Sequence, residues 1–132
     1  MAARASGDRA ALCVLDRDGA ELAGIAVEIA DDEAERARGL MGRTMLAPGT
    51  GMLFFYESPR EVAFWMQDTL IPLDMIFLDE EGRIARIHAG ARPLDETPIP
   101  SGGPVRYVLE LGGGQAAKLG LVPGFAVAPL VP

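Results

Sequence analysis

Short apolar runs separated by turns constrain the fold of this chain more than any other feature. The runs are rich in aliphatic, β-branched and aromatic residues, and glycine, proline or aspartate lies between them. They cover residues 12–15, 21–29, 52–56, 62–67, 73–78, 83–89, 105–111 and 125–127. Long helices do not alternate with these runs, which disfavours a doubly wound α/β sheet. We therefore predict a mainly β (α+β) domain, a compact barrel or sandwich of seven or eight strands with one or two short helices.

Two of the turns share one pattern, an aspartate followed three residues later by a glycine. They are Asp16–Gly19 and Asp79–Gly82. The pattern is typical of a type I turn followed by a left-handed glycine at a bulge. Neither turn continues into the longer ligand pattern of a calcium loop. We therefore predict two β-hairpins and no calcium site.

The second hairpin predicts that the only histidine stands opposite an aspartate. If pairing starts with Leu78 opposite Ile84 and continues without a bulge, Asp74 faces His88 with β-carbons about 5 Å apart. Such a pair is either an ion pair on the sheet surface or an oriented acid–base dyad. Asp74 and His88 are therefore the catalytic candidates. A shift of one residue would put the two side chains on opposite faces and end the dyad hypothesis.

Residues 31–42 carry the signals of a short helix. Asp32 followed by Glu35 is a capping-box pattern, in which each side chain bonds to a free N–H group at the helix start. The predicted apolar face consists of Ala34, Ala37 and Met41. A second short helix is expected at 114–119, after a glycine-rich turn.

The segment Phe64–Asp74 is the most informative for function. It places an aromatic ring, a thioether and several oxygen atoms around one turn, the mixture that a binding cleft requires. The ligand-binding candidates are Arg36, Arg38, Trp65, Met66, Asp68, Thr69 and Asp74. The two arginines are two positions apart on the helix, so we expect one in solvent and the other near this segment. The alternative is a structural corner, in which Asp68 and Thr69 bond to turn backbone and Trp65 fills the core.

Length and charge limit the organisation and the partners. With 132 residues, the chain has the size of one domain; we expect a flexible tail over residues 1–10 and one globular domain over 11–132. The net charge of −7 repels phosphate groups, so no nucleic acid partner is expected. No apolar run approaches the roughly 20 residues of a membrane helix, which predicts a soluble chain without membrane insertion.

The counts of cysteine and histidine limit metal and redox chemistry. Cys13 and His88 are the only residues of their kind. One chain therefore holds neither an internal disulfide nor a zinc site built from cysteine and histidine. The glycine-rich turn at 112–117 resembles a dinucleotide motif, but the chain ends before the acidic residue that such a site needs. We expect no metal and no cofactor.

Several motifs resemble the family called domain of unknown function 192. They are Arg-Gly-Leu-Met-Gly-Arg within residues 35–43, the run at 51–55, and Phe-Trp-Met-Gln-Asp-Thr-Leu-Ile-Pro-Leu-Asp at 64–74. Val-Leu-Glu-Leu at 108–111 and the following glycine-rich helix start extend the likeness, which runs from about residue 25 to 127. The resemblance implies a β-rich bacterial or archaeal domain, often exported behind a signal peptide, with no established activity. Gln67-Asp68 departs from the lysine–asparagine that is usual in the family, so no role that needs a positive charge is carried over to that position.

Three functions stay open at this point. We favour a non-enzymatic binding module for a small polar or peptidic ligand near the segment Trp65–Asp74. The alternatives are a hydrolase or lyase that uses Asp74 and His88, and a structural or assembly domain without a ligand. Residues 1–9 show no signal peptide, but a trimmed periplasmic or exported chain would look the same. The compartment and the oligomeric state therefore stay open.

Overall fold

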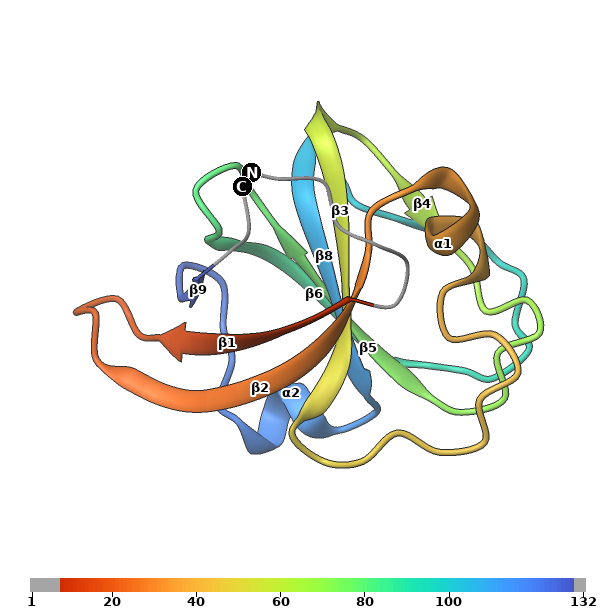
Figure 1. The fold of residues 1–132 in the computed structure, drawn as a ribbon, viewed down its shortest axis with the longest axis horizontal. Coiled ribbons are helices and arrows are strands. Elements are labelled where there is room, and N and C mark those ends of the chain that lie inside the picture. Colours follow the sequence, from red (N-terminus) through yellow and green to blue (C-terminus); the bar gives the residue numbers. More distant parts are fainter. Residues whose placement is uncertain (1–7, 130–132) are drawn as a thin grey trace.

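The computed structural model describes residues 8–129, which form one strongly curled sheet with small elements packed on it (Figure 1). The mainly β prediction is confirmed. In chain order the elements are β1 Arg9–Leu15, β2 Glu21–Ala30, α1 Glu33–Arg38, β3 Thr50–Arg60, β4 Ala63–Phe64, β5 Leu73–Leu78, β6 Ile84–Ala91, β7 Ile99–Pro100, β8 Val105–Gly112, α2 Gln115–Lys118 and β9 Ala126–Ala128. The predicted tail over residues 1–10 lies mostly outside the described residues, and its last two residues already belong to β1.

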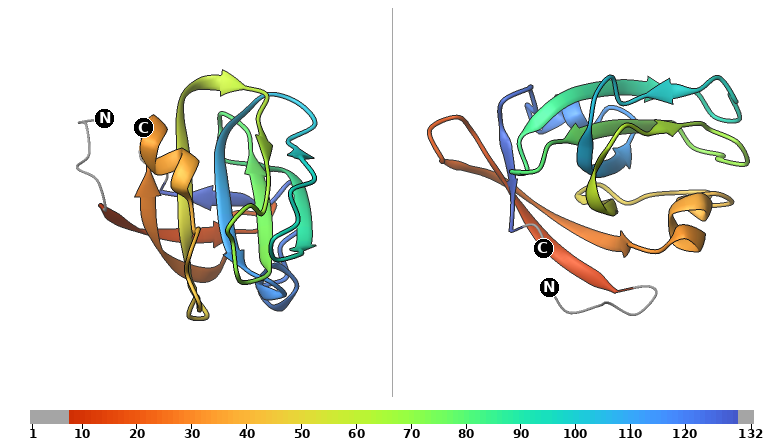
Figure 2. Two further views of the ribbon diagram at one scale, coloured as in Figure 1. Left: turned by 90° about the vertical axis from the view of Figure 1, so that its right-hand side faces the viewer. Right: turned by 90° about the horizontal axis from the view of Figure 1, so that it is seen from above.

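The seven-stranded sheet curls into a half-barrel. Its strand order is β6-β5-β8-β3-β2-β1-β9, and β4 pairs with β7 in a separate small sheet. The views in Figure 2 show how the curl brings β9 back toward the start of β6. Arg83 and Ala126 form an isolated bridge there, and the N–H of Ile84 donates to the carbonyl of Phe125 at 2.7 Å. The two edges of the sheet therefore meet at one end of the half-barrel.

Two hydrophobic cores lie on the two faces of the sheet. The inner core is enclosed by the curl, where α2 contributes Ala116. The outer core lies on the other face of β3, β5 and β8, beneath Leu40, Met66 and Ile99. Every residue of β5 is buried, as are residues 51–56 of β3. Burial on both faces explains why these runs are apolar, apart from Asp74, and do not alternate with polar residues.

The connection between β2 and β3 differs from the hairpins, because these two strands are parallel. Parallel neighbours need a crossover, which residues 31–49 supply. This crossover carries α1 and lies over the outer face of the sheet (Figure 1). It forms one wall of the candidate site described below.

The two aspartate turns adopt the predicted conformation. Oδ1 of Asp79 accepts from the N–H groups of Glu81 and Arg83, each at 2.9 Å, and Gly82 has a φ of 82°. Asp16 caps the first hairpin with the same pattern of bonds. Both aspartates therefore stabilise the turns of their own hairpins.

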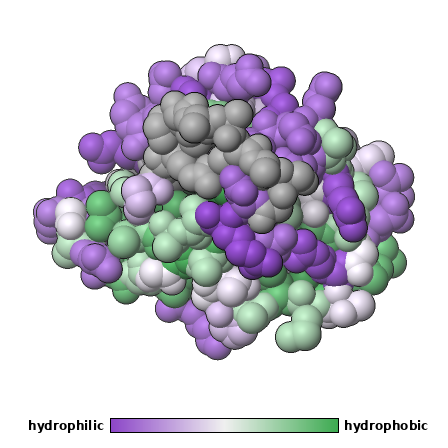
Figure 3. Space-filling model, in the orientation of Figure 1, coloured by the Kyte–Doolittle hydropathy of each residue, from purple (hydrophilic) through white to green (hydrophobic). Residues whose placement is uncertain are grey.

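Part of the surface over β1 and β2 is apolar. Figure 3 shows apolar residues gathered over the arm formed by β1 and β2, with hydrophilic residues above them. Leu22 on this arm has 45% of its surface exposed. No helix within residues 8–129 is both long enough and apolar enough to cross a membrane.

Candidate functional site

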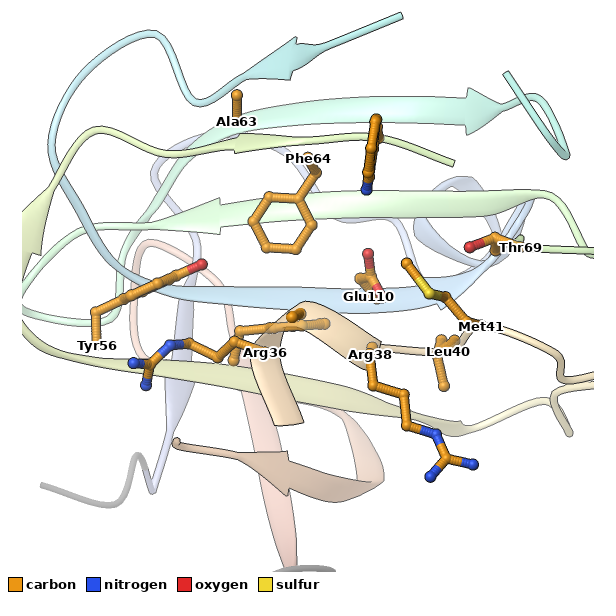
Figure 4. Close-up of a pocket in the computed structure, with 13 residues that line it drawn as sticks. Arg36, Arg38, Leu40, Met41, Tyr56, Ala63, Phe64, Thr69 and Glu110 are labelled. Carbon is orange, nitrogen blue, oxygen red and sulfur yellow. The ribbon is translucent and has the colours of Figure 1, made fainter. Parts of the chain in front are cut away.

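A cavity of about 160 Å³ opens between α1, the outer face of the sheet and the segment that includes β4 (Figure 4). Its walls come from residues 36–41, from Phe54 and Tyr56 of β3, from residues 63–65, and from Thr69 and Glu110. These elements lie far apart in the sequence, and the crossover brings them together. Aromatic rings form much of the wall, and Glu110 supplies a carboxyl group.

Helix α1 begins as the sequence predicts. Asp32 is the N-cap residue, and its Oδ1 accepts from the N–H of Glu35 at 2.7 Å. The Glu35 carboxylate accepts from the N–H of Asp31 at 3.2 Å, one residue before the N-cap. These bonds satisfy N–H groups that a helix start leaves free.

The predicted apolar face of α1 is wrong. The helix covers only Glu33–Arg38, and none of its residues is buried. Gly39 ends it with a φ of 50°, and Leu40, with 2% of its surface exposed, anchors the segment in the outer core. Because the chain turns at Gly39, Ala34 and Ala37 stay exposed. Ala37 is exposed and also lines the cavity.

Gly39 brings the end of α1 close to the sheet. A β-carbon at this position would lie 3.2 Å from Cζ of Phe54 and 3.9 Å from Oε1 of Glu110. The positive φ also disfavours any residue with a side chain. The glycine therefore lets the helix end lie over Phe54 without filling the cavity.

The predicted cluster around residues 64–74 is divided by the structure. Trp65 and Thr69 line the cavity. Trp65 has 46% of its surface exposed, whereas Thr69 is buried and donates to the carbonyl of Gln67 at 3.1 Å. Met66 is buried in the outer core and lines a separate groove, and Asp68 is exposed with a φ of 54°. The ring of Phe64, missed by the sequence analysis, packs edge-on against Phe54 with centroids 4.9 Å apart.

The two candidate arginines line the cavity but point elsewhere. Nη1 of Arg36 donates to the carbonyl of Phe55 at 2.9 Å, and its guanidinium lies 5.2 Å from the centre of the Tyr56 ring. Arg38 is exposed, and Figure 4 shows its guanidinium directed away from the other lining side chains. One arginine is in solvent as expected. The other turns toward β3 and not toward the segment 64–74.

The predicted register of the second hairpin is wrong. Leu78 does pair with Ile84, but Phe77 pairs with Arg86, so Ala85 forms a bulge. This shift pairs His88 with Met75. Asp74 consequently lies on the inner face of the sheet, whereas Met75 and His88 lie on the outer face. The side chains of Asp74 and His88 therefore form no dyad.

Asp74 instead connects three elements inside the protein. It is fully buried, with Oδ1 accepting from the N–H of Gly90 at 2.8 Å and Oδ2 accepting from the N–H of Ala116 at 2.9 Å. These bonds tie β5 to β6 and to the first turn of α2. Asp74 does not line the cavity, and its carboxylate is satisfied by the backbone.

Glu110 is another residue of the site that the sequence analysis missed. It lies on β8 opposite Met75, and only 4% of its surface is exposed. Burial alone raises the pKa of Glu110 from its ordinary value of 4.5 to about 8. Among residues 8–129, no side chain or backbone group forms a hydrogen bond or ion pair with its carboxyl group. The feature of the sequence that could have identified Glu110 is a single acidic residue inside the apolar run 105–111.

Tyr56 is the other ionisable group buried in the wall. Burial raises the pKa of Tyr56 to about 12, although the positive charges of Arg36 and Arg60 lower it in part. The guanidinium of Arg60 lies 4.5 Å from the ring centre. The phenol therefore stays neutral at physiological pH.

A second groove of about 440 Å³ lies on the far side of Met66. It contains His88, Arg86 and Arg92 together with Asp95. Arg86 is engaged, because it donates to the carbonyl of Pro100 and lies 5.8 Å from the centre of the Phe77 ring. Within residues 8–129, no group of three or more His, Cys, Asp or Glu side chains could hold a metal ion.

Comparison with known proteins places this chain in a family. The model of DUF192, described as "Uncharacterized ACR", matches residues 14–128. The structure of a candidate transcription regulator from Sinorhizobium meliloti 1021 is similar, with 38% identity, a TM-score of 0.89, and coverage of 96% of this chain and 97% of that one. A protein of unknown function from Novosphingobium aromaticivorans DSM 12444 has 42% identity and a TM-score of 0.85, covering 91% and 84% of the two chains. No curated protein matches at a significant level. Because the family model spans most of the sequence, the chain belongs to the DUF192 family.

Proposed function

We propose that this domain is a binding module for a small ligand held in the cavity beside Trp65, with Glu110 as its polar anchor. The observation that carries the proposal is the buried carboxyl group of Glu110, which no group among residues 8–129 satisfies. Buried polar groups in folded proteins nearly always have a hydrogen-bond partner. A partner from outside the protein is therefore the simplest explanation for a carboxyl group at a cavity wall.

The shape of the site supports a small ligand. The cavity of about 160 Å³ is smaller than the roughly 300–1,000 Å³ of sites for drug-sized molecules. Its lining combines aromatic and aliphatic side chains with polar groups, the mixture that fixes a ligand in one orientation. Trp65 lines the cavity and has 46% of its surface exposed, so its ring is available to contact a bound molecule.

A blocked cavity provides the test. Ala37 is exposed on α1 and lines the cavity, whereas Ala34 is exposed on the same helix and does not line it. Ala37→Phe should fill the mouth, and Ala34→Phe is the matched control. We expect compounds from a small-molecule library to raise the melting temperature of the parent protein and of Ala34→Phe, but not of Ala37→Phe, because a ligand stabilises the folded state by mass action.

Two results would contradict this function. One is a library in which no compound stabilises the parent protein, which would favour the structural or assembly alternative. The other is a set of stabilising compounds whose effect Ala37→Phe leaves unchanged, since their site would then lie elsewhere. The groove beside Met66 and His88 would be the next location to examine in that case.

A further inference from the structure

The walls around Glu110 indicate the chemical class of the ligand. Four aromatic side chains line the same cavity, namely Phe54, Tyr56, Phe64 and Trp65. Figure 4 shows Glu110 in the middle of the group, with Tyr56 at one end and Thr69 at the other. A carboxyl group beside aromatic side chains is a favourable environment for a cation, because the faces of aromatic rings attract positive charge.

The two arginines that line the cavity do not fulfil this role. Arg36 is occupied by the carbonyl of Phe55 and the ring of Tyr56. Arg38 extends away from the lining side chains (Figure 4). No ion pair with Glu110 forms among residues 8–129. The carboxyl group lacks a donor, and N–H groups on a cation are its strongest complement.

We propose that the cavity takes the primary ammonium group of a small organic amine, which donates to Glu110 and lies against the aromatic wall. The inference rests on the proposed binding function and adds the class of ligand to it. A primary ammonium carries three donors, whereas a quaternary ammonium carries none and would leave the carboxylate without a hydrogen bond.

Binding of an amine should release a proton near neutral pH. In the free protein, burial raises the pKa of Glu110 to about 8, so the carboxyl group is mostly protonated at pH 7. An adjacent ammonium favours the ionised form. The other ionisable residues in the wall are Tyr56, Arg36 and Arg38. They do not change charge near pH 7, because the pKa of Tyr56 is raised to about 12 and arginine stays protonated.

Trp65 makes the test direct, because it is the only tryptophan of the chain and lines the cavity. Its fluorescence is titrated at pH 7 and constant ionic strength with n-butylammonium chloride and with 1-butanol, a neutral molecule of similar shape. We expect n-butylammonium to bind at least tenfold more tightly than 1-butanol. Glu110→Gln should weaken n-butylammonium at least tenfold and change 1-butanol by less than threefold. Calorimetry of the parent protein in two buffers with different ionisation enthalpies should detect proton release with the ammonium only.

The outcomes separate this inference from the binding function. If 1-butanol binds as tightly as n-butylammonium, the amine inference is overturned and the binding function stands. If Glu110→Gln leaves the ammonium affinity unchanged, the amine inference and the role of Glu110 as anchor are both overturned, and only binding in the cavity stands. If the ammonium binds the parent protein without proton release, the contact with Glu110 is overturned. This measurement does not depend on whether Glu110→Gln folds. If neither probe binds, and Ala37→Phe abolishes the stabilising effect of no library compound, both proposals are overturned.

Discussion

Replacement of Glu110 by glutamine should change how stability depends on pH. An acid whose pKa is higher in the folded state binds more protons there than in the unfolded chain, so stability falls as pH rises between the two values. For Glu110 this window runs from 4.5 to about 8. The difference corresponds to roughly 5 kcal/mol once the carboxyl group is ionised, since one pKa unit is worth about 1.4 kcal/mol. Between pH 5 and pH 9, ionisation of Glu110 should therefore lower the free energy of unfolding by about 4 kcal/mol.

Glutamine keeps the shape of the side chain and cannot ionise, so it removes this loss. We therefore compare the free energies of unfolding of Glu110→Gln and of the parent protein. From pH 5 to pH 9, the difference between them should change by about 4 kcal/mol in favour of the variant. Urea unfolding at both pH values, followed by circular dichroism, measures the change. The matched control is Glu57→Gln, an exposed glutamate on β3, which should stay within about 0.5 kcal/mol of the parent protein at both values. A change in this difference of less than about 1 kcal/mol would refute the conclusion that the carboxyl group of Glu110 is buried and unpaired.

Three further substitutions test the elements that build the site, each by urea unfolding at pH 7. Asp74→Ala should cost about 3 kcal/mol, because it removes two bonds to a carboxylate and leaves the N–H of buried Ala116 without a partner; a cost below about 1 kcal/mol would contradict this. Asp32→Ala should cost about 1 kcal/mol through loss of the N-cap, and an unchanged midpoint would show that the cap contributes nothing. Gly39→Ala should cost about 1–3 kcal/mol, because alanine is strained at a φ of 50°; a more stable variant would show that the helix end relaxes.

The strands and turns could be predicted from the sequence because their signals are local. Asp79 and Gly82 lie within one turn, and the aspartate bonds only to its near neighbours. The register beyond this turn could not be predicted, because the bulge at Ala85 has no signal in the residue type. The paired strands β4 and β7 are two residues each, so their pairing depends on distant contacts and not on periodicity.

The candidate site was predictable only in part. Trp65 and Thr69 were both predicted as ligand-binding candidates, and the structure places both in the cavity wall. Other parts of the wall come from residues 36–41, Phe54 and Tyr56, which precede them, and from Glu110 on β8, which follows Thr69 by 41 residues. Asp74 and Glu110 look alike in the sequence, since each is one acid inside an apolar run. Distant contacts decide their roles, because the donors to Asp74 lie 16 and 42 residues away.

The contrast between these two acids is the strongest argument for a ligand. Asp74 pairs with Leu111 and Glu110 pairs with Met75, so the acids occupy adjacent rungs of one ladder and point to opposite faces. Both are buried, but only Asp74 receives hydrogen bonds from the described residues. A satisfied buried carboxylate stabilises the fold, whereas an unsatisfied one lowers stability wherever it ionises. Structure alone therefore accounts for Asp74. For Glu110, which lines the cavity, the proposed ligand would supply the missing donor.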